Sequence, residues 1–346
     1  MRRGGRARDV AEGETMKSIF LGSVVERAGK SMITLGVALN SGPKVGYFKP
    51  FVETLIGGRE TLVDQDAYLM RKALRLKYKE EELCPFVYDV LKPVTKEAIV
   101  DAYRRVSVDK ERMIVEGTRD IVTGSLHGVS ASFIAAAVGA KVVLISTSSP
   151  SALDKTAMLF RHMKMQQLPY HGVVLNMCDD PDVKALLEKK GIPVLGMIPE
   201  VPELGYYTVK DVADALSADI VVENGMENVV KNVLIGAMTP EGALRYMRRM
   251  PRKAVITGGD RADLQLAALS TDTACLILTG GLYPAKVVVS KAYEEGVPIL
   301  LTRYNTLETA EMIDHLIARI DPDDNEKVEK IKKVVAENVD VEVLWS

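Results

Sequence analysis

A lysine followed by a serine stands at the start of an apolar helical stretch near the beginning of the chain. The segment Gly29-Lys30-Ser31 comes after an apolar run at residues 18–21 and a loop that opens at Gly22. In a strand–loop–helix unit of this kind, backbone N–H groups and the helix dipole attract phosphate oxygens. We therefore expect Lys30 to neutralise the β- and γ-phosphates of a nucleotide and the Ser31 hydroxyl to coordinate Mg²⁺.

The loop departs from the usual phosphate-binding pattern. Val24 stands six positions before Lys30, where the pattern has glycine, and the nearest glycine is Gly22, eight positions before. A Gly-Lys-Ser triplet can also begin an ordinary helix by chance, but the surrounding order of strand, loop and helix favours a nucleotide site. The predicted phosphate-binding residues are Gly22, Ser23, Glu26, Gly29, Lys30 and Ser31.

Two charged residues follow apolar runs farther along the chain. Lys49 comes after residues 45–48, and Glu116 comes after residues 113–115. In open α/β sheets, ligands bind beyond the carboxyl ends of the strands. Lys49 is predicted to act in catalysis with Lys30, by stabilising charge on a transferred phosphoryl group or on a carboxylate acceptor. The alternative is that Lys49 is a surface cation.

Mg²⁺ prefers oxygen ligands, which makes nearby carboxylates candidates for the metal site. Glu116 has the placement of a Walker B carboxylate, and we expect it to hold the metal together with Ser31 and Asp64. The alternative for Glu116 is a turn at the end of a strand. Asn176, after the apolar run at residues 172–175, is predicted to bind the nucleotide by reading an adenine edge; a plain turn role is the alternative.

Apolar runs of strand length alternate with helical patterns along the chain. This alternation predicts a mostly parallel, doubly wound α/β sheet, followed beyond a Pro- and Gly-containing junction at residues 199–210 by a second, smaller α/β domain. The expected divisions are a disordered leader at 1–16 with Met16 as the natural start, a nucleotide-binding domain at 17–204, the second domain at 205–320, and a C-terminal helix and tail at 321–346.

Two apolar runs in the second half end in glycines. One runs into Gly259-Asp260-Arg261 and the other into Gly280-Gly281. Their backbone N–H groups, with the Arg261 side chain, are predicted to bind a second small anionic or nucleotide ligand. The alternative is a structural ion pair between Asp260 and Arg261 at a turn.

Composition restricts the remaining function classes. The chain has 346 residues with 45 basic and 47 acidic side chains, a balance that argues against nucleic acid as a partner. An apolar run of membrane-spanning length is missing from the sequence, so no membrane partner is expected. The three widely spaced cysteines suggest a reducing cytoplasm. Apolar helices in the second half suggest a homodimer or higher homo-oligomer.

The motifs together resemble those of known P-loop proteins. Tyr47-Phe48-Lys49-Pro50 and Ile114-Val115-Glu116-Gly117 resemble segments of the dethiobiotin synthetase and cobyrinate amidotransferase branch. The stretched loop resembles the N-terminal region of long phosphate acetyltransferases. The second half is similar to the DRTGG domain that follows that region, and the matching segments are Val201-Pro202-Glu203-Leu204, Thr208-Val209-Lys210-Asp211-Val212, Ala237-Met238, Thr257-Gly258-Gly259-Asp260-Arg261-Ala262-Asp263 and Leu278-Thr279-Gly280-Gly281.

The resemblance implies an ATP- and Mg²⁺-dependent enzyme that transfers a phosphoryl group to a small carboxylate or carbamate. A regulatory nucleotide sensor with little turnover, or a purely structural subunit, are the alternatives. Thr118-Arg119 replace the family's small residues after Glu116-Gly117, which puts a biotin-precursor pocket in doubt. The sequence ends where an acetyl-transferring domain would begin, so phosphate acetyltransferase activity is not expected.

Overall fold

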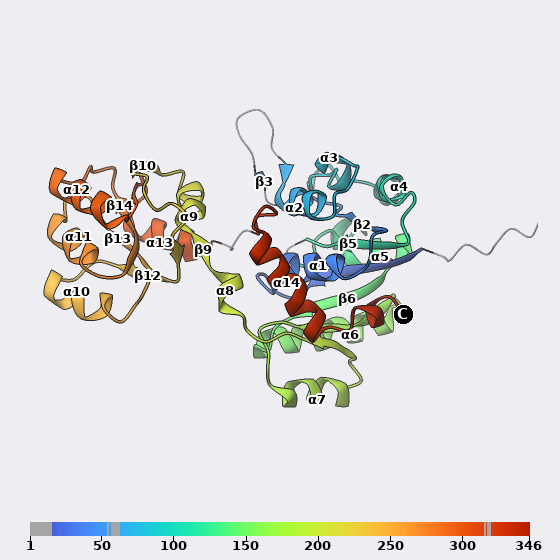
Figure 1. Ribbon diagram of the computed structural model, residues 1–346. Helices are drawn as coiled ribbons and strands as arrows, with labels where there is room; N and C mark the ends of the chain where they lie inside the picture. Colours follow the sequence, from blue (N-terminus) through green and yellow to red (C-terminus); the bar gives the residue numbers. More distant parts are fainter. Residues whose placement is uncertain (1–15, 54, 57–62, 119, 315, 317–319) are drawn as a thin grey trace, which may run out of the picture. The chain divides into compact units, whose positions relative to one another are not determined.

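The computed structural model describes residues 16–53, 55–56, 63–118, 120–314, 316 and 320–346 (Figure 1). Two compact units make up the chain: Met1–Glu200 together with Ile320–Ser346, and Val201–Arg319. The chain therefore leaves the first unit once and returns to it for its last segment. The leader predicted at residues 1–16 lies, except for Met16, outside the described residues. Within the described part of the chain, no helix is both long and apolar enough to cross a membrane.

The first unit is built on a six-stranded sheet in the order β2-β5-β1-β6-β7-β8, in which every neighbouring pair is parallel. Its strands are β1 (Lys17–Ser23), β2 (Val45–Phe48), β5 (Arg112–Glu116), β6 (Lys141–Ser146), β7 (Tyr170–Leu175) and β8 (Val194–Met197). The central strands are buried along almost their whole length, which explains their continuous apolar runs. The predicted parallel α/β sheet is confirmed.

Helices connect these strands. They are α1 (Lys30–Leu39), α2 (Gln65–Ala73), α3 (Glu80–Leu83), α4 (Lys96–Val106), α5 (Ala131–Val138), α6 (Pro150–Met165) and α7 (Pro181–Lys189). A short 3₁₀ turn (Ser125–His127) and a small hairpin of β3 (Leu55–Ile56) and β4 (Val63–Asp64) complete the connections. Lys77 and Lys79, before α3, are exposed, whereas Glu80 in α3 is buried and accepts a hydrogen bond from Arg71 at 2.8 Å.

The second unit contains a smaller sheet in the order β10-β15-β14-β13-β12, parallel except for β10. Its elements are α8 (Pro202–Gly205), β9 (Tyr207–Thr208), α9 (Val209–Leu216), β10 (Asp219–Val222), β11 (Val229–Val230), β12 (Asn232–Ile235), α10 (Pro240–Met247), β13 (Lys253–Gly258), α11 (Ala262–Leu269), β14 (Thr273–Thr279), α12 (Lys286–Glu295), β15 (Ile299–Leu301) and α13 (Thr306–Asp314). Successive residues of β13 face opposite sides of the sheet. Val255 packs in a core with α10, α11 and α12, and Ile256 packs in a second core with α9 and α13.

The C-terminal segment, α14 (Asn325–Asn338) and α15 (Val341–Leu344), packs onto the first unit. In Figure 1, α14 lies along α1, and the Asn40 amide donates to the Lys332 carbonyl at 2.9 Å. The Trp345 indole donates to Ser41 at 2.9 Å, and Val339 bridges to Gly196 of the edge strand β8. The helix and tail predicted at residues 321–346 thus pack as part of the first unit.

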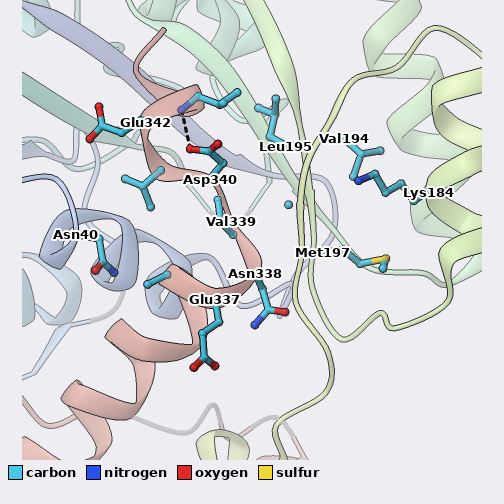
Figure 2. A pocket seen from close by; sticks show the side chains of 14 residues that line it. Asn40, Lys184, Val194, Leu195, Met197, Glu337, Asn338, Val339, Asp340 and Glu342 are labelled. Atoms are coloured by element: carbon cyan, nitrogen blue, oxygen red, sulfur yellow. Dashed lines mark hydrogen bonds between the residues drawn. The ribbon is translucent and has the colours of Figure 1, made fainter.

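A cavity of about 840 Å³ lies between the edge strand β8 and this C-terminal segment. Figure 2 shows its lining: apolar side chains of β8, Lys184, and the acidic side chains of Glu337, Asp340 and Glu342. The carboxylate of Asp340 begins α15 by accepting the Val343 N–H at 3.3 Å. Asp340 therefore serves the C-terminal turn itself, while Glu342 pairs with Arg112.

We predict that Gly36→Ala destabilises the first unit, although alanine is the better helix former. A Cβ at Gly36 would lie 2.3 Å from Cγ2 of Val335, so α14 would have to move away from α1. We expect a loss of about 1–3 kcal/mol in the free energy of unfolding, as for other overpacked contacts. Urea denaturation followed by the fluorescence of the buried Trp345, the only tryptophan in the sequence, measures it.

The same contact supplies the control. Val335→Ala makes room for the added methyl group, so it should cost less in the Gly36→Ala background than in the wild type. Strictly additive costs of the two substitutions would show that this contact does not limit how closely α1 and α14 approach.

Candidate functional site

The loop between β1 and α1 has a backbone that only glycine fits at its last position. Gly29 has φ +85°, and a Cβ there would lie 2.1 Å from Nδ2 of Asn176. The Asn176 amide donates to the carbonyl of Ala28 at 2.9 Å and is almost fully buried. Asn176 therefore holds the loop in the position from which α1 begins, and its predicted contact with an adenine edge stays a prediction.

The other predicted loop residues differ in their surroundings. Ser23 is buried at the end of β1, whereas Glu26 is exposed. A Cβ at Gly22 would lie 2.9 Å from Cδ1 of Ile121, so this glycine permits a close approach of the segment after β5. The loop is thus held from two sides, by Asn176 and by the chain near Ile121.

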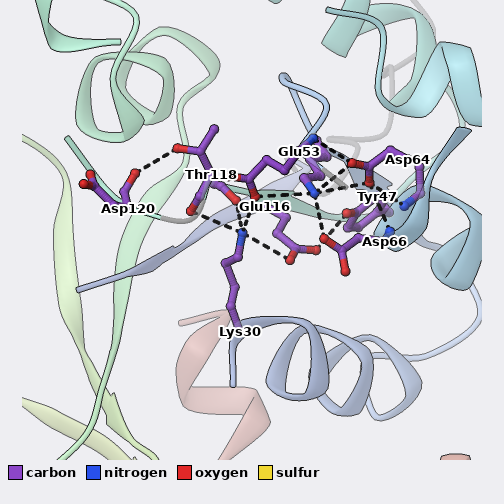
Figure 3. Close-up of polar contacts among 11 residues, drawn as sticks. Lys30, Tyr47, Glu53, Asp64, Asp66, Glu116, Thr118 and Asp120 are labelled. Atoms are coloured by element: carbon purple, nitrogen blue, oxygen red, sulfur yellow. Dashed lines mark hydrogen bonds and ion pairs between the residues drawn. The ribbon is translucent and has the colours of Figure 1, made fainter. Parts of the chain in front are cut away.

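Lys30, the first residue of α1, points across the carboxyl end of the sheet (Figure 3). Its ammonium group donates to the carbonyls of Gly117 and Thr118, the latter at 3.2 Å. It also lies 3.4 Å from Oε2 of Glu53 and 3.5 Å from Oε1 of Glu116. The structure therefore brings the predicted phosphate-loop lysine together with the predicted Walker B carboxylate.

Lys49 follows β2 and is fully buried, not a surface cation. Its ammonium group lies 2.7 Å from Oδ2 of Asp66, 3.1 Å from Oδ2 of Asp64 and 3.6 Å from Oε2 of Glu53. Burial by itself would lower the pKa of Lys49. The negative charges of Asp66, Glu116, Asp64 and Glu53 outweigh burial and hold that pKa well above its usual value, so the side chain is a permanent cation.

Two aspartates on one turn have different tasks. Asp64 caps α2: its Oδ1 accepts the N–H groups of Asp66 and Ala67 at 3.0 and 3.1 Å, and its Oδ2 accepts that of Glu53 at 3.0 Å. Asp66 also pairs with Lys49, at 2.7 Å, and lies near Ser31. Burial tends to raise the pKa of Asp66, but Lys49, Lys30 and the Ser31 hydroxyl lower it overall. Of the two, Asp66 is the better placed for a cation beside Ser31.

Sequence reasoning named Asp64 for the metal and gave Asp66 no role. The spacing of the two carboxylates in the sequence could have pointed to Asp66. An aspartate that caps a helix fixes the residue two positions later in the first turn. Asp64 is engaged by three backbone N–H groups and Lys49, and its predicted role as a metal ligand stays a prediction.

Glu116 ends β5 in a fully buried position. The Tyr47 hydroxyl donates to its Oε2 at 2.7 Å, while Oε1 has no hydrogen-bond partner among the described residues. Burial, followed by the negative charge of Asp66, raises the pKa of Glu116 to about 7 against the opposing effects of Lys30 and Lys49. An unsatisfied buried carboxylate oxygen beside a lysine marks a place where a cation would be stabilised.

These groups form an ionic cluster of two lysines with Glu53, Asp64, Asp66 and Glu116. Within the described ranges, no three His, Cys, Asp or Glu side chains converge as a ready metal cage. Mg²⁺ does not need one, because it commonly takes one or two carboxylates and fills its shell with water and phosphate oxygens. Ser31, Asp66 and Oε1 of Glu116 fit that requirement.

The glycine-rich turns of the second unit are engaged by their own chain. The N–H groups of Gly280 and Gly281 donate to the carbonyls of Tyr304 at 3.2 Å and Thr302 at 3.1 Å. Arg261 pairs with Asp263 at 3.2 Å and donates to the Met238 carbonyl. At Gly259 a Cβ would lie 1.8 Å from the Leu282 carbonyl, so close packing accounts for this glycine. The predicted second ligand site at Gly259, Asp260, Arg261, Gly280 and Gly281 stays a prediction.

The pKa of Glu116 predicts a pH dependence of stability. Its value of about 7 lies above the ordinary 4.5, so the folded state binds the proton more tightly than the unfolded state. Stability is therefore full at low pH and falls as the pH rises from about 4.5 to 7. Between pH 5 and 8 we expect the wild type to lose on the order of 2–3 kcal/mol relative to Glu116→Gln.

Urea denaturation at several pH values, again followed by Trp345 fluorescence, tests this expectation. The quantity to compare is the stability difference between Glu116→Gln and the wild type, since other titrating groups cancel in it. A difference that does not change from pH 5 to 8 would show that Glu116 titrates at its ordinary pKa.

Comparison with known families places both units. A family model described as an AAA domain (AAA_26) matches residues 17–208, and one described as a DRTGG domain matches residues 211–316. The phosphate acetyltransferase of Salmonella typhimurium is 26% identical over 369 residues, a match that covers 92% of this chain and 51% of that protein. The chain thus spans about half the length of the curated relatives it matches.

Two solved structures are also similar. A ParA family ATPase from Chlorobium tepidum is 14% identical, with a TM-score of 0.39, over 56% of this chain and 87% of that one. The CBS and DRTGG domains of a Clostridium perfringens pyrophosphatase, complexed with diadenosine tetraphosphate, are 17% identical with a TM-score of 0.28 over 45% and 82%. The resemblance to P-loop proteins and to the DRTGG domain rests on the two family models, and is confirmed. The AAA domain model matches more than half of the 346 residues of this chain. The chain therefore belongs to the AAA domain (AAA_26) family, and a DRTGG domain follows.

Proposed function

We propose that the first unit binds Mg²⁺ and ATP and transfers the γ-phosphoryl group to a small carboxylate acceptor. One observation carries this proposal: the carboxylate of Glu53 lies between two ammonium groups, 3.4 Å from that of Lys30 and 3.6 Å from that of Lys49. The chain's own anion thus stands in the place where two lysines converge. A substrate carboxylate or a terminal phosphate carries the same charge and similar oxygen geometry.

The nucleotide side of the site rests on α1. Gly29 allows the sharp turn into the helix, Lys30 is its first residue, and Ser31 follows, near enough to Asp66 to lower its pKa. Phosphate oxygens at this helix start would receive backbone N–H groups and the helix dipole. To reach them, the Lys30 ammonium group would exchange its contacts with the carbonyls of Gly117 and Thr118 for phosphate oxygens.

Mg²⁺ would be held by Ser31, Asp66 and Glu116, with water and phosphate oxygens as its other ligands. When bound, the metal supplies neutralisation of the charge on the β- and γ-phosphates. The chain's own residues prepare its place: Lys49 and the Ser31 hydroxyl keep Asp66 ionised, and Oε1 of Glu116 is left without a hydrogen-bond partner.

Transfer itself requires positioned positive charge more than covalent chemistry. An acceptor carboxylate oxygen would attack the γ-phosphorus as the bond to the β-phosphate oxygen breaks, giving an acyl phosphate and ADP. Lys49 is fixed by Asp64 and Asp66, so it requires little reorganisation to stabilise the charge between donor and acceptor. Displacement of Glu53 by the incoming anion would open the space between the two lysines.

A nucleotide sensor with little turnover is the second candidate, and one observation favours it. Four carboxylates face two lysines, so Lys49 already has its charge balanced by Asp64 and Asp66. In that case ATP would bind at α1 while Lys49 keeps a structural role. The two candidates share the nucleotide site and differ in what Lys49 does.

Both candidate functions require the nucleotide site. We predict that the wild type binds ATP in the presence of Mg²⁺. We expect Lys30→Ala to weaken this affinity at least tenfold, which is about 1.4 kcal/mol of binding free energy. Isothermal titration calorimetry with ATP and MgCl₂ measures it. Lys44→Ala is the matched control, because Lys44 is an exposed lysine paired with Glu111. Equal affinities for Lys30→Ala and Lys44→Ala would remove Lys30 from the nucleotide site.

The two candidates are separated by turnover. We expect ADP release by the wild type to increase when small mono- and dicarboxylates are added, and Lys49→Ala to reduce that rate about 10²-fold, as when one group that stabilises the transition state is removed. ATP binding by Lys49→Ala, measured by calorimetry, shows whether the variant has kept its fold. Tight ATP binding by the wild type without carboxylate-dependent turnover would favour the sensor.

A further inference from the structure

We propose that Tyr47 is a positioning residue of this site: its hydroxyl fixes one oxygen of Glu116 so that the other is presented to Lys30 and the metal. The inference rests on the proposed binding of Mg²⁺ and ATP, and it assigns a task to a residue that carries no phosphate or metal contact of its own.

Strand register brings the two side chains together. Tyr47 of β2 lies opposite Ile114 of the parallel neighbour β5, and Glu116 is two residues beyond Ile114. Side chains two positions apart on a strand point to the same face, so Tyr47 and Glu116 share one face of the sheet. Lys49, two positions beyond Tyr47, follows on the same side just after β2 ends.

Burial gives the contact its effect. Tyr47 is 1% exposed and Glu116 is fully buried, so water does not compete for the 2.7 Å hydrogen bond between the phenol and Oε2. The second oxygen, Oε1, is 3.5 Å from the Lys30 ammonium group and lacks a hydrogen-bond donor among the described residues. One carboxylate oxygen is thus committed to Tyr47 and the other is held for a ligand (Figure 3).

Without the phenol, the orientation of Glu116 would be poorly defined. The last torsion of a glutamate side chain has a broad energy minimum, so the carboxylate plane is set by its partners. Lys30 and Lys49 both attract it, and neither fixes which oxygen faces which lysine. A buried tyrosine hydroxyl needs a hydrogen-bond partner, and for Tyr47 that partner is Glu116.

The test is Tyr47→Phe in the full chain, because this substitution removes the hydroxyl and keeps the ring. Partners that orient a metal ligand typically contribute 10- to 100-fold to metal affinity. We expect the apparent dissociation constant for Mg²⁺, titrated at saturating ATP, to rise about tenfold. The affinity for ATP in the presence of EDTA should stay within about twofold of the wild type, since the Tyr47 hydroxyl donates to Glu116.

Tyr103→Phe is the matched control. Tyr103 of α4 is also buried and its hydroxyl is 2.7 Å from that of Ser18, at the start of β1 and away from the cluster. This variant should keep the wild-type constant for Mg²⁺. In a Glu116→Gln background, Tyr47→Phe should cause no further loss, because its effect acts through the carboxylate.

Each outcome decides the matter. An unchanged Mg²⁺ constant in Tyr47→Phe, or an equal loss in Tyr103→Phe, overturns the role of Tyr47 and leaves the proposed nucleotide site in place. A loss that persists in the Glu116→Gln background also overturns it. Wild-type protein that shows no Mg²⁺-dependent ATP binding overturns the nucleotide site together with this inference.

Discussion

The first unit depends on the pairing of buried charges at the carboxyl ends of β1, β2 and β5. Removing an ammonium or carboxylate group from water is costly unless it meets opposite charge and hydrogen bonds. Lys49 meets this requirement through Asp64 and Asp66, and Lys30 through two carbonyls with Glu53 and Glu116 nearby. A cluster of this kind is tolerated only where good geometry and further hydrogen bonds offset the loss of water.

The scaffold achieves this with backbone devices near each charged group. The capping of α2 by Asp64 sets the direction of Asp66, and the left-handed turn at Gly29 sets the start of α1. The Asn176 amide holds the loop through Ala28. Because each contact ends on a backbone group, it fixes the chain from which the charged side chains extend.

The helix that carries Lys30 and Ser31 has a second support. Its other residues pack against α14, which the chain reaches only after it has completed the second unit. Gly36 lets the two helices approach closely, and Trp345 and Asn40 add hydrogen bonds at the end of α1. The first unit is therefore complete only with the last 27 residues of the chain, Ile320–Ser346.

The sequence by itself determined the parallel α/β fold, the order of the two domains, and the positions of Lys30, Lys49 and Glu116 at strand ends or the start of a helix. These features follow from local patterns, because apolar runs set the strands and the polar residue that ends a run marks the sheet edge. Only the tertiary structure decided which side chains contact one another. The capping of α2 by Asp64 depends on the folded turn, and the contact of Tyr47 with Glu116 depends on strand register between segments 69 residues apart. The close packing of Gly36 on Val335 likewise depends on how the chain folds back on itself. Such contacts join residues that are far apart in the sequence, so local sequence patterns do not reveal them.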